Sequence, residues 1–134
     1  MSVAGPSLQS LDVLIIEDNH DGADSLALLL RHYGHTVRVA YTGPAGVRAA
    51  LDDPPDAILC DINLPGQSGL SIARRLADGL PAKPLLVAIT ATRADELADR
   101  ARDCGFDHFF VKPVDPVELS ELLADYAERP GRPL

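Results

Sequence analysis

The sequence predicts an α/β protein in which strands and helices alternate five times over 134 residues. Three observations support this fold class. Short apolar runs recur along the chain, and residues typical of turns bound them. Between these runs lie longer segments whose apolar residues recur every three or four positions, the spacing of one buried helix face. Because right-handed crossovers join parallel strands, the alternation predicts a doubly wound, three-layer sandwich.

The five predicted strands are short, and polar residues stand at the ends of four of them. Residues 57–60 are apolar throughout, which is typical of a strand buried on both faces of a parallel sheet. Residues 36–40 alternate between apolar and polar, which favours a position nearer the sheet edge. The full set comprises residues 11–16, 36–40, 57–60, 85–89 and 109–111.

Most of the predicted helices have a recognisable boundary. Gly34 supplies a C-terminal stop to the first helix, and Pro44 stands at the first position of the second. Gly105 closes the fourth helix. Asp115 is the predicted N-cap of the fifth, with Pro116 at its first helical position. The predicted helices span residues 22–33, 44–51, 69–77, 94–104 and 116–128.

Length and composition indicate a single domain. We expect it to run from residue 11 to residue 128, after a flexible lead of residues 1–10 and before a short tail of residues 129–134. A hydrophobic content of 46% and a charged content of 24% are those of a soluble globular protein. Cys60 and Cys104 are expected to be small core residues rather than a disulfide or a metal site.

Charge and hydropathy exclude two classes of partner. A formal net charge of −8 argues against nucleic acid, which requires clustered Lys and Arg. No apolar run approaches the ~20 residues of a membrane span, and no signal sequence is visible at the N-terminus. The sequence therefore predicts a cytoplasmic protein without membrane association.

The predicted topology gathers polar residues at one edge of the sheet. The strand order 2-1-3-4-5 is the flavodoxin-like arrangement, with a crevice between strands 1 and 3 where the winding reverses. Glu17 and Asp18 leave the first strand, and Asp61 leaves the third. By itself, an Asp at that position fits a simple turn equally well. Its place opposite two further acids, flanked by Thr90 and Lys112, favours a functional site.

Three clustered carboxylates repel one another unless a cation lies among them. Oxygen-only ligands select Mg²⁺, with Mn²⁺ as a substitute, over zinc. Lys112 supplies a charge for a phosphoryl oxygen, and the Thr90 hydroxyl can donate to another. This combination indicates phosphoryl transfer with Asp61 as the covalent acceptor.

The residues at these strand ends resemble a known family. The matching pieces are Glu17-Asp18, residues 61–66 with Gly69, Thr90-Ala91, and Phe109 followed by Lys112-Pro113. In this order and at these separations, the chain from residue 11 to about residue 128 resembles the receiver domain of two-component response regulators.

The resemblance implies a phosphoacceptor of a phosphorelay rather than an enzyme. Asp61 would take a phosphoryl group from a histidine kinase or a histidine phosphotransfer protein. Asp18, Asp61 and the backbone carbonyl of Asn63 would bind Mg²⁺, with Glu17 acting through a water. Lys112 would contact the phosphoryl group, and a cis peptide would join Lys112 to Pro113.

The resemblance also implies regulatory roles for further residues. Thr90 and Phe109 would form a coupled switch that reshapes the face made by the fourth helix, the fifth strand and the fifth helix, where a downstream protein target would dock. Ala91 is small where the phosphoryl donor needs access. Asn63 and Thr92 stand at positions that tune the phosphoryl lifetime. The oligomeric state stays open.

Two departures from the family pattern stand out. The first acidic pair is Glu-Asp rather than Asp-Asp, and the switch aromatic Phe109 replaces Tyr, so it has no hydroxyl to bond when it points outward. The segments around the fifth strand look like those of receivers attached to hybrid sensor kinases.

Two other function classes compete with the phosphoacceptor interpretation. An aspartyl-nucleophile phosphatase would carry a second Asp two residues after the nucleophile, but Asn63 stands there and cannot exchange the catalytic proton. A phosphorylation-independent interaction module or a flavin binder on the same fold is the other alternative. The retention of all acids, the Thr and the Lys argues against such a module, and Glu17-Asp18 would repel a flavin phosphate.

Overall fold

The computed structural model describes residues 10–91 and 95–128 of the chain. A five-stranded parallel sheet in the order β2-β1-β3-β4-β5 forms its centre, which confirms the predicted topology. The edge position of β2 agrees with its alternating sequence. The strands are β1 (Asp12–Ile16), β2 (Thr36–Ala40), β3 (Ala57–Asp61), β4 (Leu85–Thr90) and β5 (His108–Val111).

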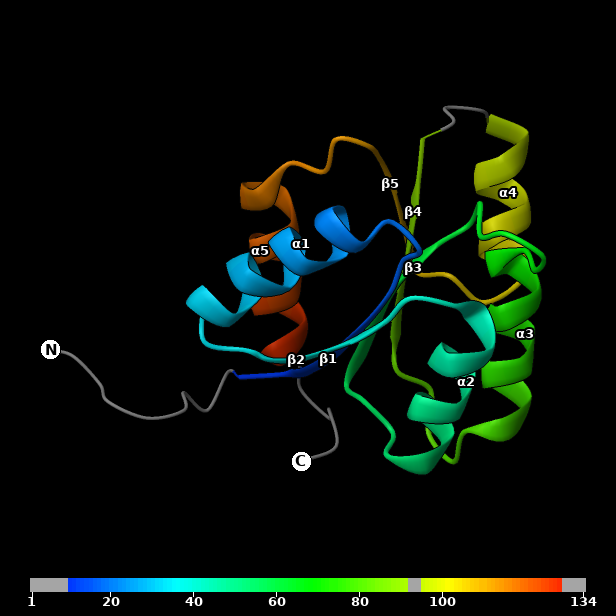
Figure 1. Cartoon of the computed structure of the whole chain (residues 1–134), viewed down its shortest axis with the longest axis horizontal. Coiled ribbons are helices and arrows are strands. Elements are labelled where there is room, and N and C mark those ends of the chain that lie inside the picture. Colours follow the sequence, from blue (N-terminus) through cyan, green and yellow to red (C-terminus); the bar gives the residue numbers. More distant parts are fainter. Residues whose placement is uncertain (1–9, 92–94, 129–134) are drawn as a thin grey trace, which may run out of the picture.

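Helices cover both faces of the sheet, as Figure 1 shows: α1 and α5 lie on one face, and α2, α3 and α4 on the other. The same segregation divides the core into two clusters of buried side chains, one on each side of the sheet. The helices are α1 (His20–His32), α2 (Gly43–Asp52), α3 (Gly69–Gly79), α4 (Asp95–Asp103) and α5 (Pro116–Ala127).

Aliphatic residues build both clusters, as expected for a chain without Trp. Cys60 is fully buried in the cluster beneath α2, α3 and α4, and Cys104 packs half-buried against it. Both thiols are free, so their prediction as core residues is confirmed.

Strand register brings the functional edge together. Ile16 pairs with Cys60, Asp61 pairs with Ile89, and Thr90 pairs with Val111. Parallel strands place all their carboxyl ends at one edge of the sheet. The residues that end or follow β1, β3, β4 and β5 therefore surround a single crevice.

Several element boundaries differ from the predicted ones. Helix α1 begins at His20, two residues earlier than expected, because the Asn19 side chain accepts a hydrogen bond from the Gly22 amide at 2.8 Å and caps the helix. Asp61 and Thr90 are the last residues of β3 and β4 rather than the first residues after them. The sheet ladder reaches both, since the Ile62 amide donates to the Ile89 carbonyl at 3.0 Å and the Lys112 amide donates to the Thr90 carbonyl at 2.8 Å.

The predicted N-cap of α5 and the predicted stop of α1 are confirmed, whereas α2 begins at Gly43 after the N-cap Thr42, so Pro44 is its second residue and not its first. The carboxylate of Asp115 accepts hydrogen bonds from the amides of Val117 and Glu118 at the start of α5. Gly34 has a positive φ of 99° directly after the end of α1, which is the usual conformation of a glycine stop. Helix α3 continues two residues beyond its predicted end, to Gly79.

The predicted lead and tail lie almost entirely outside the described residues. Ser10, the last residue of the lead, is described, and its hydroxyl donates to the Gly34 carbonyl at 2.8 Å. Among the described helices, none has the length and apolar character needed to cross a bilayer.

Candidate functional site

The candidate site lies at the carboxyl edge of the sheet. Asp61 ends the central strand β3 and is 5% exposed. Glu17 follows β1, Thr90 ends β4, and Lys112 follows β5. The structure thus brings together the four elements whose polar ends the sequence singled out.

Glu17, Asp18 and Asp61 form a carboxylate cluster. One oxygen atom from each lies within 4.8 Å of the others. Glu17 and Asp61 are buried, whereas Asp18 is exposed. An all-carboxylate donor set with one side open to water fits Mg²⁺, which prefers oxygen ligands and retains several waters. The residues present are therefore suited to this ion.

Lys112 crosses the crevice to the two buried acids. Its Nζ lies 2.5 Å from Oε1 of Glu17 and 3.0 Å from Oδ2 of Asp61. The Lys112–Pro113 peptide is cis, as the resemblance implied, and the Lys112 amide donates to the Thr90 carbonyl at 2.8 Å. These contacts hold the ammonium group beside Asp61.

Burial and charge shift the protonation equilibria of the site. Burial raises the pKa of Glu17, and repulsion from Asp61 adds to that shift, while hydrogen bonds from Lys112 and the Asn19 amide oppose it. Burial tends to lower the pKa of Lys112, but its bonds to Glu17 and Asp61 outweigh this effect and raise it. Three carboxylates outnumber the single ammonium, so the cluster favours a further cation.

Asn63 touches both Asp61 and Thr90. Its backbone amide donates to Oδ1 of Asp61 at 2.8 Å, and its side-chain Nδ2 donates to the Thr90 hydroxyl at 2.9 Å. Thr90 is completely buried. Sequence reasoning assigned Asn63 a carbonyl ligand and a tuning role but missed this side-chain contact, which no local pattern signals across 27 residues.

The loop after β3 leaves no room for a side chain at Gly69. A Cβ atom there would lie 2.6 Å from the Asp61 carbonyl oxygen and 2.7 Å from the Ile62 Cα. The Gly69 amide donates to the Ile62 carbonyl at 2.9 Å. This close approach seats the start of α3 against the backbone that carries Asp61.

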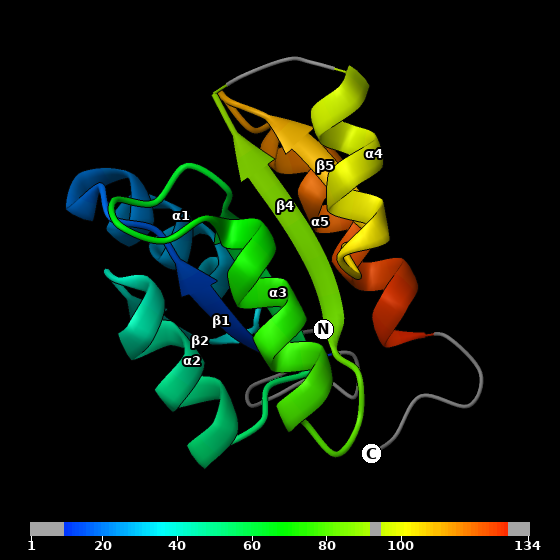
Figure 2. The ribbon, with the colours of Figure 1, turned by 90° about the vertical axis from the view of Figure 1, so that its right-hand side faces the viewer.

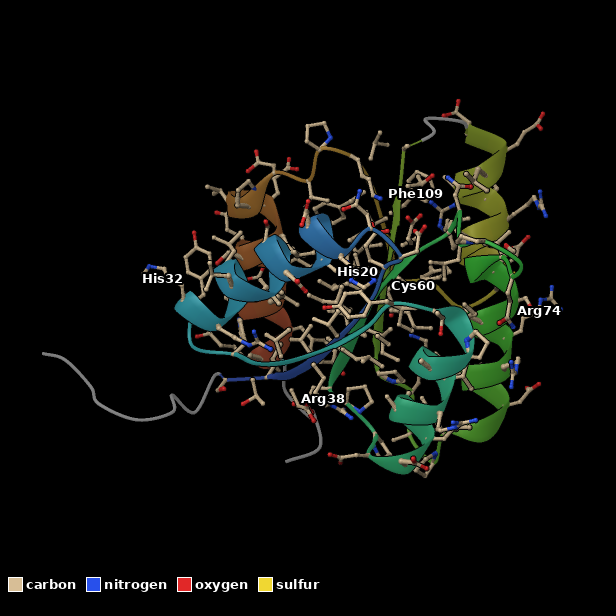
Figure 3. The ribbon with its side chains drawn as sticks, viewed as in Figure 1. His20, His32, Arg38, Cys60, Arg74 and Phe109 are labelled. Carbon is tan, nitrogen blue, oxygen red and sulfur yellow. The ribbon has the colours of Figure 1, made fainter. Side chains whose placement is uncertain are left out.

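The remaining predicted residues lie around this centre. Phe109 is half-buried in β5 and packs against the core cluster on the α4 side of the sheet (Figure 3). Ala91 is exposed directly after β4. Thr92 lies outside the described residues. The exposed His20, at the start of α1, stacks its ring on Tyr41 with ring centroids 3.7 Å apart.

An apolar groove opens beside the carboxylates, and the sequence did not reveal it. Its volume is about 630 Å³, and it runs between α1 and the loop from β5 to α5. Leu26 and Leu29 of α1 and Val114 of the loop line it, and Asp61 and Lys112 also lie in its lining. Access to Asp61 is therefore bordered by an apolar wall.

Residues 13–124 match the model of the response regulator receiver domain. The chain belongs to this family. Solved receiver domains have the same architecture: that of the sensor histidine kinase PA1611 from Pseudomonas aeruginosa PAO1 is 26% identical, with a TM-score of 0.81, over 90% of this chain and 99% of that one. The PA1611 structure holds a magnesium ion coordinated in its active site cleft.

Relatives of this receiver domain differ in length. The response regulator ArlR of Staphylococcus saprophyticus is 33% identical over 112 residues, which are 84% of this chain and 49% of ArlR. An uncharacterized 14.6 kDa protein of Leptolyngbya boryana is 30% identical over 122 residues, 90% of this chain and 92% of that protein. The chain thus spans about half the length of the ArlR relatives it matches.

Proposed function

We propose that this receiver domain is the phosphoacceptor of a two-component phosphorelay, with Asp61 as the acceptor. One observation carries the proposal above all others: the buried Asp61 carboxylate is held by the Asn63 amide on Oδ1 and by Lys112 on Oδ2. These contacts fix a nucleophilic carboxylate at the open edge of the sheet beside a fixed positive charge.

The donor would be a phosphohistidine of a sensor kinase or a histidine phosphotransfer protein. An Asp61 oxygen attacks phosphorus, a P–O bond forms, and the P–N bond to the donor imidazole breaks with its electron pair returning to nitrogen. The products are an aspartyl phosphate and a neutral histidine, because the imidazolium of the donor already carries the proton that remains. No general base is required, since the attacking group is an ionised carboxylate.

Mg²⁺ is the cofactor that this donor set fits. Asp18, Asp61 and the Asn63 carbonyl would hold it, and Glu17 would act through a water. When bound, the ion would neutralise charge on the phosphoryl oxygens. Lys112 would contact one phosphoryl oxygen, and the exposed Ala91 leaves space for the donor.

Thr90 and Phe109 would convert phosphorylation into a change of surface. The Thr90 hydroxyl would donate to a phosphoryl oxygen, and Phe109 would move inward beneath β5. That movement would reshape the face of α4, β5 and α5, which a downstream protein would read. Asn63 and Thr92 would set the lifetime of the phosphoryl group.

The experiment is phosphorylation by acetyl phosphate with Mg²⁺, read by intact mass. We expect one added phosphoryl group, none after EDTA treatment, and none in Asp61→Asn, which keeps the size but removes the nucleophilic charge. Asp99→Asn, an exposed Asp on α4, is the matched control and should phosphorylate normally. An added group that persists in Asp61→Asn would show that another residue is the acceptor.

The two alternatives make different predictions for the same samples. A phosphorylation-independent interaction module would gain no mass under any condition. An aspartyl-nucleophile phosphatase would release inorganic phosphate from small phosphoesters with steady turnover, which the Asn at position 63 disfavours.

A further inference from the structure

A second groove lies on the face that the proposed switch would reshape. It has a volume of about 490 Å³ and is bounded by the first turns of α4 and α5, with β5 between them. Figure 2 shows α4 lying alongside β5 on this side of the molecule. The apolar part of its lining consists of Ala98, Phe109, Phe110, Val111 and Pro113.

Three carboxylates line this groove, and none of the described residues in its lining is basic. Asp95 stands at the start of α4, Asp115 caps α5, and Glu118 lies in the first turn of α5. The groove beside Asp61 contains Lys112, and a third groove between α3 and α4 contains Arg74 and Arg100. Among these three grooves, only the one over β5 has acidic side chains and no basic ones among its described lining residues.

The acidic character extends along α5. Between Pro116 and Ala127 this helix has Glu118, Glu121 and Asp125 and not a single Lys or Arg. On α4, Arg102 lies 3.2 Å from Asp99 and so already has an acidic neighbour. The charge of this face is therefore negative beyond the groove itself.

Helix dipoles do not cancel this charge. The N-termini of α4 and α5 both border the groove, and each has the effect of about half a positive charge. The Asp115 carboxylate already accepts the amides of Val117 and Glu118. Three full negative charges exceed the two partial positive ones, so the described groups that border the groove carry a net negative charge.

We infer that this groove binds a basic segment of a partner protein, with one aliphatic or aromatic side chain on the floor and Lys or Arg side chains against the rim. The half-buried ring of Phe109 offers apolar contact to the anchoring side chain, and Asp95 and Glu118 offer ion pairs. The same carboxylates would repel nucleic acid and anionic membranes. The inference rests on the proposed function, because Phe109 is both the proposed switch residue and part of the groove.

Charge-matched synthetic peptides test the inference. The probe is a short capped peptide of Lys and Leu, with a Glu–Leu peptide and a Lys–Ser peptide as controls. Binding is measured by fluorescence anisotropy and mapped on backbone amide shifts, with and without beryllofluoride and Mg²⁺ as a phosphoryl substitute. We expect the Lys–Leu peptide alone to shift Ala98, residues 109–111 and Glu118, with an affinity that falls as salt is added.

Two groove variants and one control variant locate the contact between the peptide and the protein. Glu118→Gln should weaken the Lys–Leu peptide about two- to fivefold, the change expected for one exposed ion pair. Glu121→Gln on the same helix, outside the groove lining, is the matched control and should bind as the unsubstituted protein does. Ala98→Leu should also weaken binding, because the larger side chain fills the floor.

The outcomes separate this inference from the proposed function. Equal weakening by Glu118→Gln and Glu121→Gln, or equal binding of the Lys–Ser peptide, would overturn the groove as the site. If beryllofluoride shifts the amides around Asp61 while the Lys–Leu peptide leaves the groove unshifted, the inference fails and the phosphoacceptor function stands. If beryllofluoride shifts nothing while the peptide maps to the groove, the basic-segment site stands and the phosphoacceptor function fails.

Discussion

The side-chain amide of Asn63 donates a hydrogen bond of 2.9 Å to the buried hydroxyl of Thr90. The backbone amide of the same Asn63 donates to Asp61. One residue therefore connects the proposed phosphoacceptor to the proposed switch. Because the Thr90 oxygen accepts this bond, the Asn63 side chain acts directly on the position of the proposed switch hydroxyl.

Removing the side-chain amide of Asn63 should weaken the binding of a phosphoryl substitute without weakening the binding of Mg²⁺. Asn63→Ala keeps the backbone carbonyl, so the Mg²⁺ dissociation constant should change less than about twofold. A neutral hydrogen bond contributes about 1 kcal/mol, so beryllofluoride affinity should fall about fivefold. Calorimetry measures both constants.

A double-mutant cycle with Thr90→Val provides the control for the Asn63 prediction. Residues that share a hydrogen bond should give non-additive effects. If the losses from Asn63→Ala and Thr90→Val simply add in the double variant, the contact between these side chains plays no part in phosphoryl binding.

Lys112 and Thr90 should differ in their effects on phosphoryl transfer. Lys112→Ala removes charge where negative charge develops, and we expect transfer from acetyl phosphate to slow about 10²-fold or more. Thr90→Ala should leave Asp61 phosphorylatable while reducing the amide shift changes on α4 and β5. Time courses by intact mass, paired with amide spectra, measure the two effects. Similar loss of phosphorylation in both variants would contradict this division of roles.

Glu17 should make stability depend on pH in the absence of Mg²⁺. Burial raises its folded pKa above the ordinary value of 4.5, so the folded state retains this proton longer than the unfolded state does. The contribution of Glu17 to the free energy of unfolding therefore falls as pH rises from about 4.5 through the raised pKa. Glu17→Gln should raise Tm at about pH 7 and give a smaller gain near pH 4, measured by thermal unfolding in EDTA.

The same protonation should compete with the metal. Mg²⁺ affinity should decrease as pH is lowered through the raised pKa of Glu17, because the proton and the ion require the same carboxylate. In Glu17→Gln this pH dependence should flatten in that range. An unchanged profile would mean that Glu17 takes no part in binding the ion, even through a water.

Gly69→Ala should damage the site from outside it. The added Cβ would lie 2.6 Å from the Asp61 carbonyl oxygen, so the backbone must shift. We expect a loss of about 1–3 kcal/mol in the free energy of unfolding and slower phosphorylation of Asp61. Gly22→Ala is the control: its Cβ would meet nothing closer than 3.4 Å, and helix α1 should gain slightly. Denaturant unfolding of both variants measures the contrast.

Local signals explain how much of the fold was predictable. Apolar runs predicted four of the strands and an alternating run predicted β2, and the topology of parallel sheets then placed Glu17, Asp61 and Lys112 at one edge. These features depend on short stretches of sequence and on rules common to all such sheets. The predicted start of α1 at residue 22 is two residues late, because the cap depends on the Asn19 side chain folding back to accept from the Gly22 amide.

Contacts between distant segments were not predictable from the sequence. Whether Asp61 and Thr90 belong to their strands depends on partners across the sheet, such as the Ile89 carbonyl that accepts from Ile62. The Asn63–Thr90 bond and the acidic groove over β5 arise only when segments far apart in the chain meet. Each requires a side-chain orientation that no periodicity encodes.

Phe109 should set how far phosphorylation changes the face of α4, β5 and α5. Its ring is half-buried against the core on the α4 side and also lines the acidic groove. Lacking a hydroxyl, it loses no hydrogen bond when it moves inward, so the inward state should be partly populated without a phosphoryl group. Phosphorylation shifts such an equilibrium only as far as it stabilises one state more than the other. If the inward state is already partly populated, phosphorylation changes its population less.

Phe109→Tyr should therefore enlarge the response. The added hydroxyl bonds to water when the ring is outward and loses that bond on burial, which favours the outward state by about 1 kcal/mol. The difference between spectra with and without beryllofluoride should grow for residues 95–104 and 108–122, while Mg²⁺ affinity stays constant. Phe110→Tyr, whose ring packs on the opposite core cluster, is the matched control and should leave that difference unchanged. If Phe109→Tyr responds no more strongly than the unsubstituted protein with Asp61 saturated, the ring does not move between two states, and the face over β5 receives no signal through it.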